Sequence, residues 1–94
     1  MYVVIRSYSG QGASELFDLL AQREEDVKEL ISGVPGFVSY AAFRTADGVK
    51  TVTVCDDKAG TDESSSRAAA WIGENVDASV DPPEITEGDT FIQF

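Results

Sequence analysis

Two neighbouring stretches of the sequence have the composition of β-strands, and both carry large or apolar side chains on each predicted face. The first runs over residues 37–44 and the second over residues 50–56, with Asp47-Gly48 supplying the turn between them. Successive side chains of a strand point to opposite faces, so both faces of this hairpin need to be covered. A chain of 94 residues has too few helices to cover both. We therefore expect a sheet whose second face is completed by another subunit.

The periodicity of the rest of the chain predicts two helices and two further strands. Residues 2–8 are rich in β-branched and aromatic side chains, which is typical of a strand. From about Ser14, apolar residues recur at helical spacing and predict one amphipathic helix of about five turns. Gly33 is placed to adopt the left-handed conformation at its end. A second helix is expected to begin at Thr61, and a last strand covers residues 85–94.

The resulting order, β-α-β-β-α-β, predicts an α+β fold of the ferredoxin-like type over one domain, residues 1–94. Both helices would pack on one face of a four-stranded antiparallel sheet, and the other face would be open. If Val3 and Ile5 face the helices, the open side holds Tyr2, Val4, Arg6 and Tyr8. We expect two such open faces to meet in a homodimer.

Composition limits the partners of this domain. A hydrophobic content of 43% with 26% charged residues describes a globular chain, and a net charge of −10 repels nucleic acid and anionic membranes. No stretch approaches the ~18 apolar residues of a membrane span, and the N-terminal residues lack the layout of a signal peptide. The single Cys55 forms no internal disulfide. We expect a cytoplasmic protein.

A resemblance to a known family rests on VPGFVSYAAFR at 34–44, VTVCDDKAGTDES at 52–64 and the Ala-rich helix that follows. These stretches resemble the dimeric α/β-barrel superfamily and, within it, the antibiotic-biosynthesis-monooxygenase-like proteins. The resemblance covers nearly the whole chain. It implies a homodimer whose two sheets form an eight-stranded barrel, with a small aromatic ligand bound between each sheet and its helices and with no cofactor.

The sequence contains no histidine, which excludes Ser-His-Asp and Cys-His catalysis, an axial His for haem and any His-based zinc site. Haem-degrading members of the superfamily carry an Asn on the first strand, which Ser7 matches here. Their axial His has no counterpart in this sequence, and only their helical aromatic residue is matched, by Trp71. Haem degradation is therefore not expected.

Three other motifs have structural interpretations. Gly10-Gln11-Gly12 is expected to be a strand-to-helix turn, because Glu15 would oppose a pyrophosphate. The acidic residues around the start of the second helix are expected to be structural and not metal ligands. If their carboxylates converged on one ion, a metal-dependent enzyme would be a third hypothesis. Cys55 is expected to be a small buried apolar residue. The acidic residues are Asp56, Asp57, Asp62 and Glu63.

Candidate ligand-binding residues lie on both predicted helices, on the second strand and, at Ser7, on the first strand. The Ser- and Ala-rich second helix either packs closely on the sheet or leaves a pocket beside Trp71, and both remain open. Tyr40 and Arg44 share one strand face and serve either that pocket or the dimer interface. Arg23 or Glu24 puts a charge at the buried edge of the first helix.

Two functions fit these features. In the first, the protein is a cofactor-independent oxygenase in which Trp71 and Tyr40 hold an aromatic ring. Arg23 or Arg44 would then stabilise a phenolate or enolate. In the second, it is a non-catalytic binding or structural dimer whose pocket is filled by side chains. An empty, partly polar cavity between helices and sheet would distinguish the two.

Overall fold

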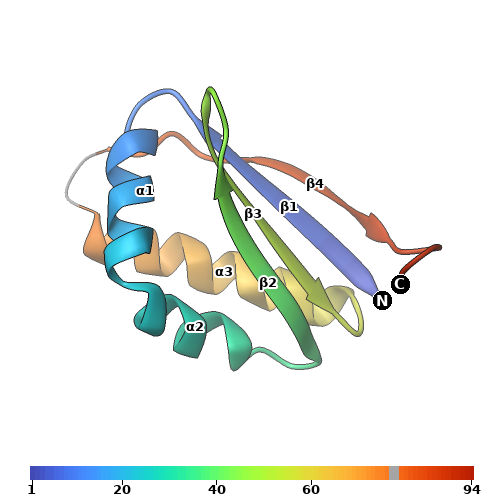
Figure 1. Ribbon diagram of the computed structural model, residues 1–94. Helices are drawn as coiled ribbons and strands as arrows, with labels where there is room; N and C mark the ends of the chain where they lie inside the picture. Colours follow the sequence, from blue (N-terminus) through green and yellow to red (C-terminus); the bar gives the residue numbers. More distant parts are fainter. Residues whose placement is uncertain (77–78) are drawn as a thin grey trace.

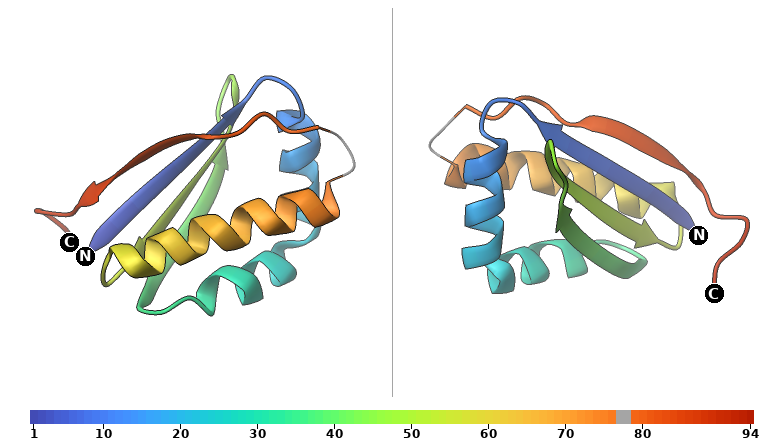
Figure 2. Two further views of the ribbon diagram at one scale, coloured as in Figure 1. Left: turned by 180° about the vertical axis from the view of Figure 1, so that it is seen from behind. Right: turned by 45° about the horizontal axis from the view of Figure 1, so that its top comes forward.

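The computed structural model describes residues 1–76 and 79–94 and has the predicted ferredoxin-like α+β fold. A four-stranded antiparallel sheet in the order β2-β3-β1-β4 carries the helices on one face (Figures 1 and 2). No helix in these residues combines the length and the apolar character needed to cross a bilayer. The elements are β1 (Tyr2–Ser9), α1 (Ala13–Gln22), α2 (Glu24–Ser32), β2 (Phe37–Arg44), β3 (Gly48–Cys55), α3 (Lys58–Asn75) and β4 (Glu84–Asp89).

The prediction of one long first helix is wrong, because the chain breaks it at Arg23 into α1 and α2. Arg23 has φ −111° and ψ 33°, outside the helical region. Hydrogen bonds still flank the break, since the Arg23 N–H donates to the Leu19 carbonyl and the Arg23 carbonyl accepts from Val27. Figure 1 shows the two helices meeting at an angle. As a result α1 packs on β3 and α2 on β2, which one straight helix does not do.

The second predicted helix, α3, begins three residues before the expected start. Asp57 is its N-cap, and the Asp57 side chain accepts a hydrogen bond from the backbone N–H of Gly60. Thr61, the expected cap, is instead buried in the first turn of α3. An Asp cap thus replaces the predicted Thr cap.

Three boundaries also differ from the prediction. Gly33 has φ −81°, so it is not left-handed, and Gly36 with φ 68° makes the turn into β2 instead. The hairpin strand β2 matches its predicted range, whereas β3 begins two residues early, at Gly48. The last strand ends at Asp89, and the chain beyond it exposes Phe91, Ile92 and Phe94.

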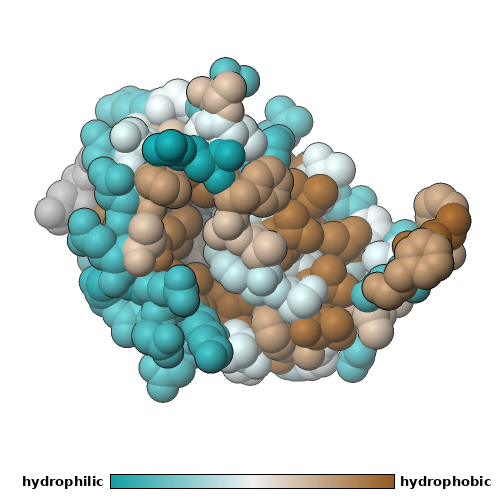
Figure 3. Space-filling view, in the orientation of Figure 1, coloured by the Kyte–Doolittle hydropathy of each residue, from teal (hydrophilic) through white to brown (hydrophobic). Residues whose placement is uncertain are grey.

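The two faces of the sheet are the reverse of those expected. Arg6 pairs with Thr51 and Ile5 with Val52, and the helices cover the face that holds Arg6 and Thr51. The open face carries the half-buried aliphatic residues of the two central strands. Hydrophobic residues accordingly gather over the strands in the space-filling view (Figure 3). The aliphatic residues on this face are Val3, Ile5, Val52 and Val54.

Helix α3 lies close to the sheet at its N-terminal end because Gly60 has no side chain. A Cβ at Gly60 would overlap the Pro35 carbonyl oxygen and lie 2.8 Å from the Cβ of Cys55. A Cβ at Gly73, in the same helix, would meet nothing within 4 Å. The small residues at the start of α3 therefore set its distance from β3.

We predict opposite effects for alanine at these two glycines. Gly60→Ala should lower the free energy of unfolding by about 1–3 kcal/mol, because the helix has to move away from the sheet. Gly73→Ala should raise it by up to about 1 kcal/mol, the difference in helix propensity. Urea unfolding of both variants measures this, and equal changes in the two would contradict the close approach of α3.

Candidate functional site

Arg6 is the most unusual residue of the helix-covered face. It is 1% exposed, and its guanidinium donates to four neutral hydroxyl groups. Nε donates to Thr51 Oγ1 at 3.0 Å and Nη2 to Thr53 Oγ1 at 2.6 Å, while Nη1 donates to Ser64 Oγ at 3.1 Å and Ser65 Oγ at 2.9 Å. None of the described carboxylates forms an ion pair with it. A positive charge is thus enclosed without a counter-charge.

Burial lowers the pKa of Arg6, but the group stays charged because a guanidinium is not deprotonated in proteins. Two phenols lie near it, Tyr8 and Tyr40. Burial raises the pKa of both, and the Arg6 charge opposes this only in part. Both phenols are therefore neutral at physiological pH and act as hydrogen-bond donors, not as bases.

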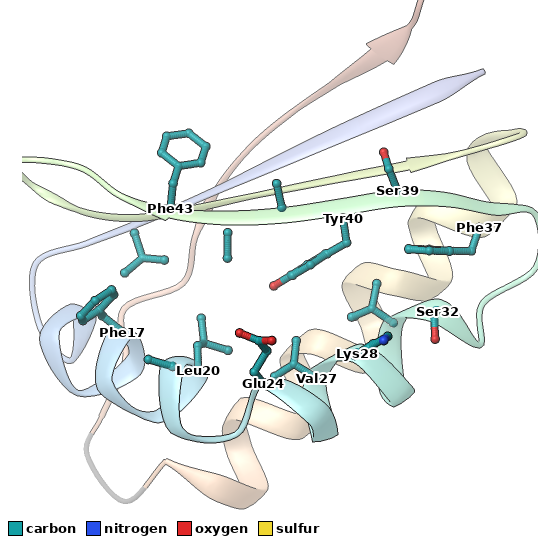
Figure 4. A pocket seen from close by; sticks show the side chains of 15 residues that line it. Phe17, Leu20, Glu24, Val27, Lys28, Ser32, Phe37, Ser39, Tyr40 and Phe43 are labelled. Atoms are coloured by element: carbon teal, nitrogen blue, oxygen red, sulfur yellow. The ribbon is translucent and has the colours of Figure 1, made fainter.

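A cavity of about 670 Å³ lies between the edge strand β2 and the helices α1 and α2. Its walls are mainly apolar, with Phe17 and Leu20 from α1 facing Phe37 and Tyr40 from β2 (Figure 4). An irregularity between Phe37 and Ser39 shifts the register of β2, so that Phe37 shares the face of Cys55 and lines the cavity. The only described charged residues that line it are Glu24 and Lys28, both exposed.

Tyr40 connects this cavity to the buried arginine. A second space of about 20 Å³, room for little more than one water, is lined by Arg6, Tyr8 and Trp71. Tyr40 lines both spaces, and Figure 4 shows its hydroxyl directed from β2 toward the helices. The large cavity therefore has a phenol in its wall with a fixed positive charge behind it.

The structure brings four of the five predicted site residues toward the helix-covered side. The Arg23 guanidinium lies 5.7 Å from the Trp71 ring centroid and pairs with Asp26. The Arg44 guanidinium lies 4.7 Å from the ring of Phe17, which lines the cavity. Tyr40 lines it directly. The fifth residue, Ser7, is on the open face, where its hydroxyl accepts a hydrogen bond from Lys50 at 2.8 Å.

Sequence reasoning missed Arg6 because it assigned this residue to the open face. The sequence did contain an indication of a buried polar group. Thr51 and Thr53 alternate with valines on β3, and Ser64 and Ser65 lie on the helix that packs over them. These hydroxyls are the acceptors that a buried guanidinium needs. No group of three or more potential metal ligands occurs among the described residues.

Cys55 is fully buried, as expected from the sequence. Burial raises the pKa of its thiol, and the negative charges of Asp56 and Asp57 raise it further. A thiol with these neighbours is a poor nucleophile at neutral pH.

We predict that Thr53→Val destabilises the protein by about 1.5–3 kcal/mol. Valine has nearly the shape of threonine but lacks the hydroxyl that accepts a hydrogen bond from the buried Arg6. Ser66→Ala, which removes a hydroxyl from an exposed position on α3, is the control and should change stability by no more than about 0.5 kcal/mol. Thermal and urea unfolding measure both. If the two variants have equal stability, the hydroxyls are not required by Arg6.

The fold matches several solved structures of low sequence identity. NE2512, a protein of unknown function from Nitrosomonas europaea, aligns with a TM-score of 0.70 at 18% identity, over 99% of this chain and 90% of its own. HapK from Hahella chejuensis aligns with a TM-score of 0.65 at 14% identity, over 100% and 96% of the two chains.

A variant of SnoaB, a cofactor-independent oxygenase from Streptomyces nogalater, aligns with a TM-score of 0.55 at 16% identity, over 99% of this chain and 93% of its own. No family model and no curated protein matches the sequence. These likenesses confirm the fold that the predicted resemblance implied for one chain, and they show the fold alone.

Proposed function

We propose that the protein binds a small aromatic molecule in the cavity beside β2 and oxidises it with dioxygen, without a cofactor. The observation that carries this proposal is the cavity itself. It has about 670 Å³ of space, apolar walls and the hydroxyl of Tyr40 directed into it. A space of this size and character is typical of small-molecule sites. The fold shared with SnoaB, described as a cofactor-independent oxygenase, supports the choice of reaction.

The walls suit a flat ring. Phe17 on α1 and Phe37 on β2 supply two aromatic surfaces, and Leu20 and Val27 complete an apolar lining. Tyr40 is neutral and donates a hydrogen bond to an oxygen of the ligand. The cavity opens to solvent beside Glu24, where water takes up the proton of a ligand hydroxyl group.

An electron-rich phenol reacts with dioxygen through its own electrons once it is ionised. The ring carbon forms a bond to one oxygen atom and gives a hydroperoxide, and loss of water leaves a quinone. Each turnover consumes one dioxygen and one phenol and produces one quinone and one water. The protein's contribution is to orient the ring and to stabilise the phenolate.

We propose further that the protein is a homodimer formed by the open faces of two sheets. The aliphatic side chains on this face, together with the exposed Phe43 and the tail residues Phe91 and Ile92, form the apolar surface that a partner would bury. A second copy is the natural occupant, because the surface is a sheet face of the same width and pattern in each subunit.

We predict saturable binding of 1-naphthol by calorimetry, with oxygen uptake equal to the quinone formed. Ala42→Leu adds bulk on the strand face that carries Tyr40 and should weaken binding about tenfold. Ala70→Leu, exposed on α3, is the control and should bind as the wild type does. Binding without oxygen uptake would contradict the oxygenase activity and favour a non-catalytic binding protein. Absence of binding would contradict both and favour the structural dimer.

We predict that the wild type sediments at twice the 10.1 kDa mass of the chain. Val52→Asp puts a charge at the centre of the open face and should give a folded monomer, because the carboxylate would be buried unpaired in the interface. Ala70→Asp on α3 should remain dimeric. A wild type that is monomeric at micromolar concentration would contradict the dimer.

A further inference from the structure

We propose that the site selects acidic aromatic ligands, which bind in the ionised form as phenolates, and that the buried Arg6 charge is what selects them. This inference rests on the proposed ligand cavity and names the ligand class. In the bound state the ligand oxygen accepts a hydrogen bond from Tyr40, with the guanidinium of Arg6 behind it. The proton leaves to water at the exposed edge of the cavity.

The first argument is the unbalanced charge. Arg6 is the only fully buried cation in the described part of the chain, and the groups that contact it are neutral hydroxyls. Hydroxyl dipoles satisfy the N–H groups but do not neutralise the charge. Because the guanidinium does not lose its proton, only an anion nearby can balance it. A phenolate in the adjoining cavity supplies that negative charge.

The second argument is a donor without an acceptor. A guanidinium has five N–H groups, and the four hydrogen bonds of Arg6 use one on Nε, two on Nη1 and one on Nη2. One Nη2 hydrogen thus has no acceptor among the residues that the structure describes. Arg6 also lines the small space that shares Tyr40 with the large cavity. The free donor and the phenol of Tyr40 therefore line the same small space, and Tyr40 also lines the large cavity.

The third argument concerns the other charges around the cavity. The titratable groups near Arg6 are Tyr8 and Tyr40, which burial keeps neutral, and the buried thiol of Cys55. Glu24 and Lys28 of α2 line the cavity at its exposed side, have opposite signs and are screened by solvent. The α1 and α3 residues that line the two spaces carry no charge. Two further cations lie beside the walls: Arg44, exposed over the ring of Phe17, and Arg23, which faces Trp71 and pairs with Asp26. Among the described residues, Arg6 is therefore the one buried and unpaired charge beside the cavity.

The net charge of −10 determines which form of the ligand approaches the protein more readily. A free anion is repelled as it approaches, whereas a neutral phenol is not. We infer that the ligand enters as the neutral acid and ionises inside, where the Arg6 charge lowers its pKa. Ligands without an acidic hydrogen gain nothing from Arg6.

A pair of matched probes tests this in the wild-type protein. 4-Nitrophenol reports its own ionisation by absorbance, and 4-nitroanisole has the same ring but no acidic hydrogen. We expect 4-nitrophenol to bind at least about tenfold more tightly at neutral pH, with a bound pKa about 1–2 pH units below that of the free probe. Equal affinities and an unchanged pKa would overturn the inference but leave the cavity intact. If neither probe binds, the proposed function fails with it.

Salt concentration identifies which cation is responsible. Screening at 1 M salt extends over only about 3 Å, so it removes the effect of an exposed charge but not of a buried one. The lowered pKa of bound 4-nitrophenol should persist at 1 M salt and in Lys28→Met. Loss of the effect under either condition would assign it to the edge of the cavity and overturn the role of Arg6.

Variants of Arg6 complete the test. In Arg6→Met the bound pKa should return to the free value while 4-nitroanisole binds as before, and Arg6→Lys should keep part of the effect because it keeps the charge. Tyr40→Phe removes only the hydrogen bond and should lose a smaller part. Circular dichroism confirms folding, and a folded Arg6→Met with an unchanged bound pKa contradicts the inference.

Discussion

The enclosed charge of Arg6 is the constraint on which the arrangement of this protein depends. A guanidinium between a sheet and a helix needs acceptors on every side, and they come from β3 and α3. Thr51 and Thr53 consequently occupy the face that would ordinarily hold aliphatic side chains. Because side chains alternate, Val52 and Val54 of β3 lie on the open face, while Val49 lies under the helices. The threonines under the helices and the aliphatic residues on the open face thus have one cause.

The same requirement explains where space is left in the molecule. Helix α3 approaches the sheet closely at Gly60, which allows Ser64 and Ser65 to reach the guanidinium. Close packing is therefore the outcome for the Ser-rich start of α3, and only a small space remains beside Trp71. The large cavity lies instead along α1 and α2, where the break at Arg23 lets the two helices follow different strands.

Much of the fold could be predicted from periodicity, whereas the inner face of the sheet could not. The range of β2 and the element order follow from strand and helix patterns. Alternation shows which residues share a face, but not which face is inside, because Thr and Val both favour strands. Arg6 was assigned outward for this reason. The break between α1 and α2 at Arg23 was also not predictable, because no Pro or Gly occurs there. We attribute it to the tertiary contacts of the two helices with different strands.

Strand β2 links the proposed dimer to the cavity. Tyr40 and Ala42 face the helices, whereas Ala41 and Phe43 pair with residues of the open face. A shift of one residue in β2 would exchange the two sets and remove Tyr40 from the cavity. A partner subunit packed on Phe43 would oppose that shift, and the register irregularity before Ser39 sets which residues point inward. In the proposed assembly, dimerisation therefore holds the ligand-binding phenol in register with the buried arginine.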